Sequence, residues 1–383
     1  MNLDELLRVA ASNRASDLHL KVGNYPHLRI DGELYPMTRF PRVSPEEMTE
    51  MAFFLMTDQH KERFEQKRDI DLAYGIAGVG RFRINVFQQR GSLGMAVRLI
   101  PNVIFKMDEL HLPPVIGKLC DERRGLVLVT GSTGCGKTTT LAAMIDYINS
   151  TRTDHIITIE DPIEFLHRDD KGFVHQREVE VDTPSFRIAL RAALRQDPDV
   201  ILVGEMRDME TILIALQAAE TGHLVFSTLH TLDATETVQR IISAFPLSDQ
   251  MQIRLQLSST VRGIVCQRLV RKCDGVGRVP AAEVMVTTQY IRACIIDEEK
   301  TNLIRGAIAA GASQYGMQTF DQSLYDLYSQ KLITLEEALL QASNPADFKL
   351  RAAGIRATTD VASEEMEPTR KVDRFVRRGT LHD

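Results

Sequence analysis

The segment from Gly131 to Thr138 has the pattern Gly-x-x-x-x-Gly-Lys-Thr, which is typical of a phosphate-binding loop. Its glycines allow consecutive backbone N–H groups to turn toward phosphate oxygens, while Lys137 and Thr138 supply a cation and a hydroxyl ligand for Mg²⁺. An apolar run over 126–130 precedes the loop and a helix-forming run over 139–148 follows it, which is the context that this motif requires. The sequence therefore predicts binding of a nucleotide with Mg²⁺. The residues predicted to bind it are Ser132, Thr133, Gly134, Cys135, Gly136, Lys137, Thr138 and Thr139.

Three further apolar runs each end in a group that could act on phosphate. The run 155–159 leads into Glu160 to Glu164, the run 199–203 leads to Glu205, and the run 224–229 ends at His230. Helical patterns over 186–195 and 210–220 separate these runs, which predicts a parallel sheet covered on both faces. Ligands of such sheets bind outside the carboxyl ends of the strands, so we expect all four groups to line one rim.

Each of these groups also has an ordinary structural interpretation. Glu205 comes shortly after four consecutive aliphatic residues. Phosphate-loop enzymes place at this position the acidic residue that faces the metal ion. The alternative is a solvated carboxylate at the end of a strand. Glu164 follows Asp161-Pro162, and an Asp-Pro pair also opens turns and helices. His230 and His223 flank the fourth apolar run, and their joint placement favours a role in sensing phosphate over two structural histidines.

Residues 1–100 are expected to form a separate small α/β domain. The pattern predicts an amphipathic helix over 3–10, a strand over 17–20, a hairpin at Asp31-Gly32, and a second helix capped by Ser44. Alternation predicts strands over 80–87 and 95–100, joined by a turn over 88–94. Period two then places Arg81, Arg83 and Asn85 on one face.

The composition of the chain indicates which binding partners and which cellular compartment to expect. The 383 residues carry a net charge of −6, which argues against the broadly basic surface of a nucleic-acid-binding protein. Five cysteines form no CxxC pair, and neither a leader segment nor an 18-residue apolar stretch is present in the sequence, so we expect a cytoplasmic protein. Prolines bracket a linker over 101–114. The charged segment 351–383 is expected to be a flexible tail rather than a short basic amphipathic helix around Phe375.

The four motifs together resemble those of the hexameric type II/IV secretion and pilus motor ATPases, and most of all the branch of type IV pilus retraction ATPases. The matching segments are a Walker A box at 131–138, an Asp box at 157–165, a Walker B box at 199–208 and a His box at 221–231. The resemblance extends from residue 15 to about 350. It implies a PAS-like N-terminal domain over 1–100 and a RecA-like ATPase domain, with a mostly parallel sheet, over 115–350.

The resemblance also implies roles for individual residues in ATP hydrolysis. Glu164 corresponds to the carboxylate that polarises the attacking water, and Glu205 to the Walker B acid that holds Mg²⁺, usually through water. Arg81, Arg83 and Arg98 correspond to the arginines with which the N-terminal domain closes onto the nucleotide. Without the resemblance, paired strand arginines would be interpreted as a solvated face.

The implied assembly is a homohexamer that acts on an inner-membrane platform protein, at the cytoplasmic face of that membrane. Relatives that extend pili or secrete proteins carry a four-cysteine module after the His box, which this sequence lacks, so retraction of type IV pili and twitching motility are favoured. A motif of retraction ATPases matches at 290–297 but departs at Ile296 and Asp297, which affects coupling to retraction rather than nucleotide chemistry. An accessory ATPase paired with a paralogous motor, an assembly or secretion ATPase, and a nucleic-acid translocase stay open as alternatives.

Cys135 lies within the phosphate loop beside Lys137 and the amide dipoles. This electropositive setting predicts a thiolate at position 135 that reacts with alkylating agents and is protected by ATP.

Overall fold

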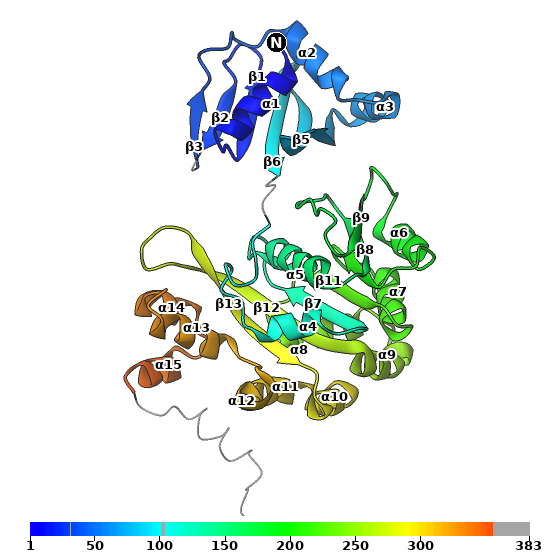
Figure 1. Ribbon diagram of the computed structural model, residues 1–383, viewed down its shortest axis with the longest axis vertical. Coiled ribbons are helices and arrows are strands. Elements are labelled where there is room, and N and C mark those ends of the chain that lie inside the picture. The colour runs from blue at the N-terminus through cyan, green and yellow to red at the C-terminus, as the bar shows by residue number, and fades with distance from the viewer. Residues whose placement is uncertain (31, 101–103, 355–383) are drawn as a thin grey trace, which may run out of the picture. The chain divides into compact units, whose positions relative to one another are not determined.

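The computed structural model describes residues 1–30, 32–100 and 104–354 of the chain (Figure 1). It contains two compact units. The first comprises residues 1–104 together with 164–167, and the second comprises residues 105–163 and the residues from 168 onward. No helix of the described residues is both long enough and apolar enough to cross a membrane.

The first unit is built on a six-stranded antiparallel sheet with the strand order β3-β2-β1-β6-β5-β4. Its strands are β1 (Asp17–Lys21), β2 (His27–Ile30), β3 (Glu33–Pro36), β4 (Asp69–Ile76), β5 (Gly80–Gln89) and β6 (Ser92–Ile100). Its helices are α1 (Leu3–Ser12), α2 (Pro45–Phe54) and α3 (Asp58–Lys67).

Local sequence signals account for the ends of these elements. The Ser44 hydroxyl accepts a hydrogen bond from Glu47 N and the Glu47 carboxylate accepts one from Ser44 N, which forms a capping box at the start of α2. The predicted first helix is confirmed, and its apolar stripe is buried. Strands β5 and β6 run further than predicted, because a two-residue turn at Arg90 and Gly91, both with positive φ, replaces the expected loop over 88–94. The hairpin predicted at Asp31-Gly32 joins β2 to β3, although Asp31 itself lies outside the described residues.

The second unit is built on a seven-stranded sheet with the order β13-β12-β7-β11-β10-β8-β9. Its strands are β7 (Gly125–Thr130), β8 (His155–Glu160), β9 (Phe173–Glu178), β10 (Val200–Val203), β11 (Leu224–Leu229), β12 (Val261–Arg271) and β13 (Arg278–Val286). All neighbours pair in parallel except β12 and β13, which form an antiparallel hairpin.

Helices cover both faces of this sheet. Alternate residues of β7 face opposite sides: Val127 and Val129 pack with α4 (Val115–Cys120) and α5 (Lys137–Thr151), whereas Leu126 and Leu128 belong to the core on the other side. That second core is formed with α6 (Phe186–Ala193), α7 (Met209–Glu220), α8 (Ala234–Ser243) and α9 (Leu247–Thr260). Burial on both faces explains why the strands are apolar throughout rather than alternating, as predicted for a parallel sheet.

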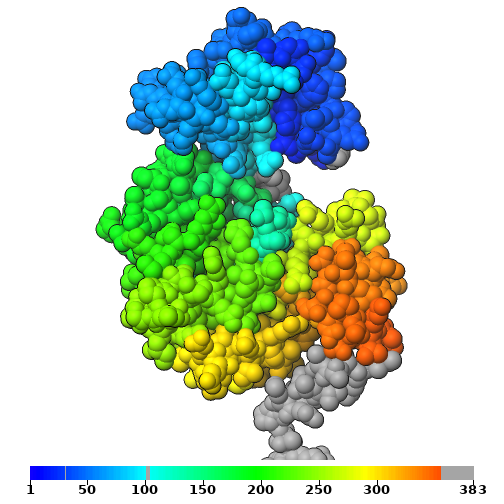
Figure 2. All heavy atoms as spheres, turned by 180° about the vertical axis from the view of Figure 1, so that it is seen from behind, coloured from blue at the N-terminus to red at the C-terminus, as the bar shows by residue number. Residues whose placement is uncertain are grey.

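A group of short helices completes the unit beyond β13. They are α10 (Gln289–Ile296), the 3₁₀ helix η1 (Glu298–Leu303), α11 (Ile304–Ala310), α12 (Ala312–Tyr315), α13 (Phe320–Ser329), α14 (Leu335–Gln341) and α15 (Pro345–Ala352). Helices α13 to α15, orange in the space-filling view, lie against the body of this unit (Figure 2). Of the predicted linker, residues 101–103 lie outside the described part and Leu112 is buried in the core beneath α4. The segment around Phe375 also lies outside it.

Candidate nucleotide site

The phosphate loop connects the carboxyl end of β7 to the first turn of α5. Its three glycines, Gly131, Gly134 and Gly136, have φ values of +140°, +77° and +92°, which side chains other than glycine rarely adopt. A Cβ at Gly131 would lie 2.5 Å from the carbonyl oxygen of Gln267, so position 131 also requires glycine for space. The predicted strand, glycine loop and helix are therefore present, with the backbone conformations that such a loop needs.

Lys137 and Thr138 occupy the first turn of α5. The Lys137 ammonium donates hydrogen bonds to the carbonyl oxygens of Gly131 at 2.8 Å and Ser132 at 3.0 Å, which holds the cation over the loop. Gly136, the residue before the helix, provides no side-chain cap, so the first amides of α5 face the loop with their partial positive charge. This combination of amides, helix N-terminus and ammonium favours an anion with several oxygens, such as the phosphates of a nucleotide.

The prediction of a reactive thiolate at Cys135 is wrong. The side chain is 3% exposed and packs beneath the loop, with its Sγ 2.6 Å from the position that a Cβ of Gly131 would take. Burial raises the pKa of the Cys135 thiol, and this effect exceeds the opposing influence of Lys137. The sequence indicated which charges lie near the thiol, but its burial depends on how the loop folds back onto β12.

The strand registers bring the other predicted groups to the same edge of the sheet. Val203 pairs with Ser227 and Leu229 pairs with Thr130, so Glu205, His230 and the phosphate loop all follow the carboxyl ends of neighbouring parallel strands. The topology thus brings three of the four expected groups to one edge of the sheet, whereas Glu164 groups with the first unit.

Glu205 and His230 also approach each other directly. His230 Nε2 lies 3.6 Å from Glu205 Oε2, and Arg207 Nη2 lies 2.5 Å from Glu205 Oε1. The Glu205 side chain is 13% exposed, whereas those of His230 and Arg207 are mostly exposed. All three residues line a cavity of about 720 Å³ between the rim and helices α7 and α8. Glu205 is thus a largely enclosed carboxylate with a cationic neighbour rather than a freely solvated side chain.

His223 does not belong to this group. It precedes the first residue of β11, at the amino end of the strand, and its Nδ1 lies 2.9 Å from the carbonyl oxygen of Ala218 at the end of α7. The expectation that His223 and His230 act together is therefore wrong, because a six-residue strand separates them along the sheet.

The Asp box begins within β8 and, together with the neighbouring strand β9, provides carboxylates in different environments. Glu160 is 7% exposed and accepts hydrogen bonds from the Thr158 hydroxyl at 2.7 Å and the Gln176 amide at 3.1 Å. Glu178 on β9 is also buried and accepts a hydrogen bond from Ile163 N. Glu164, four residues beyond the end of β8, is exposed. Glu164 is therefore exposed to water, as is Asp161 of the same box, whereas Glu160 and Glu178 are buried.

The three predicted arginines of the first unit lie on one face of its sheet. Arg83 on β5 pairs directly across from Arg98 on β6, and Arg81 lies two residues before Arg83. Arg98 Nε lies 3.1 Å from Asp17 Oδ1 and Arg83 Nε lies 3.6 Å from Asp71 Oδ1, and both guanidinium groups are exposed. Exposed pairs of this kind contribute only about 0.2–1 kcal/mol, so the guanidinium groups can exchange partners at little cost.

Sequence reasoning missed residues that support the site from a distant part of the chain. The Gln267 carbonyl lies beneath Gly131, and the Gln267 side chain donates a 2.9 Å hydrogen bond to the Thr140 hydroxyl on α5. Glu283 on β13 accepts a hydrogen bond from Ala234 N at the start of α8. A polar residue within an apolar strand is the signal that could have identified both of them.

The residues present fit a magnesium nucleotide. Thr138 is placed at the loop to provide a hydroxyl ligand, and the largely enclosed carboxylate of Glu205 lies at the same edge of the sheet. A bound Mg²⁺ would neutralise negative charge on the phosphates.

Comparisons with known proteins identify the family of this chain. The family model described as "Type II/IV secretion system protein" matches residues 2–310. The type IV pilus retraction ATPase PilT of Pseudomonas aeruginosa is 45% identical over 348 residues, which cover 91% of this chain and 100% of that protein. The type IV pilus ATPase PilU of the same organism is 41% identical over 350 residues, which cover 91% of this chain and 91% of that protein.

A solved structure described as the pilus retraction motor PilT with bound ADP matches with a TM-score of 0.83 and 48% identity, covering 90% of this chain and 98% of that one. The ATPase DotB of Legionella pneumophila matches with a TM-score of 0.77 and 29% identity, covering 92% and 96% of the two chains. The predicted α/β architecture and the resemblance to pilus retraction ATPases are therefore confirmed. This chain belongs to the type II/IV secretion system protein family of ATPases.

Proposed function

We propose that this chain is an ATP-hydrolysing motor that powers retraction of type IV pili. The observation that carries the proposal is the shared rim at which the phosphate loop, Glu205 and His230 meet at the ends of three neighbouring strands. We infer retraction rather than extension of the pilus from the similarity to the retraction ATPase PilT, which extends over the whole length of that protein.

In this proposal the loop amides and Lys137 bind the β- and γ-phosphates of ATP, while Thr138 and Glu205 hold Mg²⁺, Glu205 through water. Glu164 orients and polarises the attacking water, which its exposed carboxylate can reach. His230 reports the state of the γ-phosphate to Glu205 through their 3.6 Å contact.

Arg81, Arg83 and Arg98 supply positive charge to the transferring phosphoryl group when the arginine face engages a nucleotide. The ion pairs of Arg83 with Asp71 and of Arg98 with Asp17 are solvent-accessible on the arginine side and are weak enough to be released. An arginine that reaches this charge can accelerate hydrolysis by about 10³ to 10⁵ by analogy with arginine fingers.

The working assembly in this proposal is a homohexamer acting on a platform protein at the cytoplasmic face of the inner membrane, with no nucleic acid involved. A second candidate is an accessory ATPase that works beside a paralogous motor, which is favoured by the 41% identity to PilU and by the departures at Ile296 and Asp297 from the retraction motif.

Deleting the gene and counting surface pili, together with a twitching assay, tests the proposal. Excess pili with lost twitching, rescued by the wild type but not by Glu164→Gln, are expected. Bald cells would instead indicate pilus assembly. Retraction driven by this protein in cells that lack a paralogous motor would exclude the accessory function. Unchanged pili would refute a retraction motor that works alone and would favour the accessory function or a function outside pili.

A further inference from the structure

Glu283 is a buried carboxylate that the proposed mechanism does not use. It lies within the apolar strand β13 and is 4% exposed. Its Oε1 accepts a hydrogen bond of 2.9 Å from Ala234 N, the first residue of α8, although the two residues are 49 positions apart in the sequence. A buried carboxylate is costly unless it is hydrogen-bonded, so this contact explains how the strand accommodates it.

The start of α8 determines where the segment after His230 lies. Asp233 caps the helix by accepting a hydrogen bond from Glu236 N at 2.7 Å, and the hydroxyls of Thr231 and Thr237 lie 2.7 Å apart. Glu283 satisfies a further amide of the first turn, which has no partner within the helix. Only three residues separate His230 from this attachment point.

The partner strand of Glu283 supports the phosphate loop. Glu283 pairs with Cys266 on β12, and Cys266 pairs with Thr130, the residue before Gly131. The next residue of β12, Gln267, contacts Gly131 through its carbonyl and Thr140 through its side chain. The β12–β13 hairpin thus contacts the phosphate loop on one strand and the start of α8 on the other.

We propose that Glu283 is a positioning residue of the ATPase, which fixes the start of α8, and with it His230, to the same hairpin that supports the phosphate loop. The inference concerning hydrolysis rests on the proposed function. Glu283 acts through the backbone of α8 and has no contact with the rim groups Lys137 or Glu205 among the described interactions.

The charges around Glu283 make this attachment sensitive to pH. Burial raises the pKa of Glu283 to about 7, and Asp233, which caps α8, adds to the increase. The backbone hydrogen bond from Ala234, Arg305 on α11 and Arg268 on β12 oppose it. Cys266, directly across the hairpin, is buried and its thiol pKa is raised, so it contributes no charge. Ionisation of Glu283 strengthens its hydrogen bond to Ala234 N, because bonds to a charged acceptor are the stronger ones.

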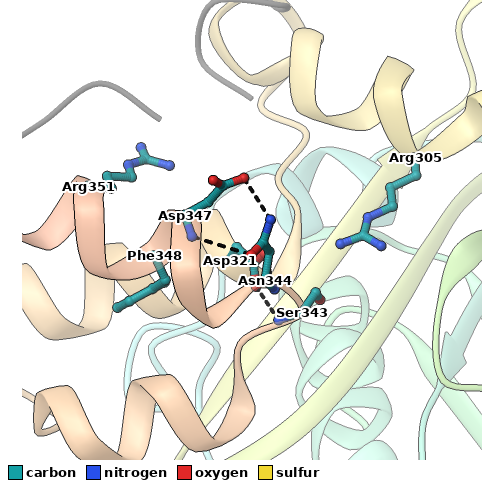
Figure 3. A pocket seen from close by; sticks show the side chains of 7 residues that line it. All are labelled: Arg305, Asp321, Ser343, Asn344, Asp347, Phe348 and Arg351. Carbon is teal, nitrogen blue, oxygen red and sulfur yellow. Dashed lines mark hydrogen bonds between the residues drawn. The ribbon is translucent and has the colours of Figure 1, made fainter. Parts of the chain in front are cut away.

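Arg305 is one source of the positive charge that acts on Glu283. Figure 3 shows it on its own helix, across a cavity of about 380 Å³ from Asp321, Asn344 and Asp347. Those three residues are linked through Asn344, which donates to the carboxylates of Asp321 and Asp347. No described ion pair joins Arg305 to either carboxylate, and its positive charge opposes the rise in the pKa of Glu283.

The test compares the full-length variants Glu283→Gln, which keeps an acceptor, and Glu283→Met, which removes it. Asp321→Asn is the matched control, because Asp321 also accepts backbone amides, from Ser343 and Asn344, away from the rim. Hydrogen exchange of peptides spanning 231–238 reports the amide of Ala234, and ATPase kinetics from pH 6 to 9 report kcat and KM separately.

We expect Glu283→Met to accelerate exchange at the start of α8 at least tenfold and to lower kcat at least tenfold, with KM for ATP changed less than threefold. Glu283→Gln should retain protection and stay within threefold of the wild-type kcat at pH 8, but lose the inflection near pH 7. The Asp321→Asn control should match the wild type in both measurements.

Three results would overturn the proposal: unchanged exchange in Glu283→Met, equal impairment of kcat in the Gln and Met variants, or a rise in KM with kcat unchanged. A wild-type protein that hydrolyses no ATP would refute the proposed function instead. In that case the exchange measurement still decides whether Glu283 holds the start of α8.

Discussion

Removing the charge at position 283 should stabilise the protein at neutral and higher pH but not in acid. The unfolded chain loses the proton of Glu283 near the ordinary value of 4.5, whereas the folded protein keeps it until about pH 7. Between these values the unfolded state binds fewer protons, so the free energy of unfolding falls as pH rises and levels off above pH 7. Glu283→Gln has no proton to lose and escapes this decrease.

The size of the effect follows from the two pKa values. The difference between them corresponds to a decrease in the free energy of unfolding of about 3 kcal/mol over the whole titration range. Between pH 5 and pH 8 the decrease is about 2–3 kcal/mol. For a domain of about 150–250 residues, each kcal/mol shifts Tm by about 2–4 °C, so the expected change is about 5–10 °C.

Thermal melts of the wild type and Glu283→Gln at pH 5 and pH 8, without nucleotide, measure this effect. The Tm difference, variant minus wild type, should be about 5–10 °C larger at pH 8. An equal difference at both pH values would refute the reasoning, because the carboxyl group would then titrate alike in the folded and unfolded states. A larger difference at pH 5 would also refute it, because the folded-state pKa would then be lowered rather than raised.

Three other predictions follow from the geometry. Gly131→Ala should weaken binding of a fluorescent ADP at least tenfold, because the added Cβ would lie 2.5 Å from a backbone oxygen. Gly134→Ala, whose added Cβ would meet open space, should lose less affinity, and equal losses of affinity would contradict the steric argument. Iodoacetamide at pH 8 should modify the exposed Cys273 at least tenfold faster than the buried Cys135, as measured by peptide mass spectrometry. Faster modification of Cys135 would instead support the reactive thiolate that the sequence predicts there. Arg254→Met should lower the free energy of unfolding by about 2–4 kcal/mol in denaturant titrations, because Arg254 is 7% exposed and donates hydrogen bonds to Ile295 O and the Thr301 hydroxyl. Arg278→Met, at an exposed position, is the control, and a similar loss of stability in both variants would argue against the buried contacts.

Much of the nucleotide site could be predicted because its parts are local in the sequence. The glycine loop, the strand before it and the helix after it are consecutive, and their chemistry depends on residue types at fixed spacing. Apolar runs identified the strands that carry Glu205 and His230, and the rule that parallel strands share a carboxyl edge brought them together.

Local signals also account for the correct helix starts and for the arginine face. Ser44 with Glu47 marks the start of α2, and period two places Arg81 and Arg83 on one side of β5. The cap and the alternation along β5 depend on backbone geometry within a few residues, whereas Arg98 joins the arginine face only through the pairing of β5 with β6.

The tertiary structure decided the features that depend on burial or on contacts between distant residues. Cys135 is a buried thiol because the loop packs onto Gln267, and His223 lies away from the rim because the direction of β11 places it at the amino end. Glu283 meets Ala234 only once β13 has paired with β12 and α8 has packed against the sheet. The sequence alone determines which groups can do chemistry, whereas strand register and packing determine their distances, their exposure to water and therefore their pKa values.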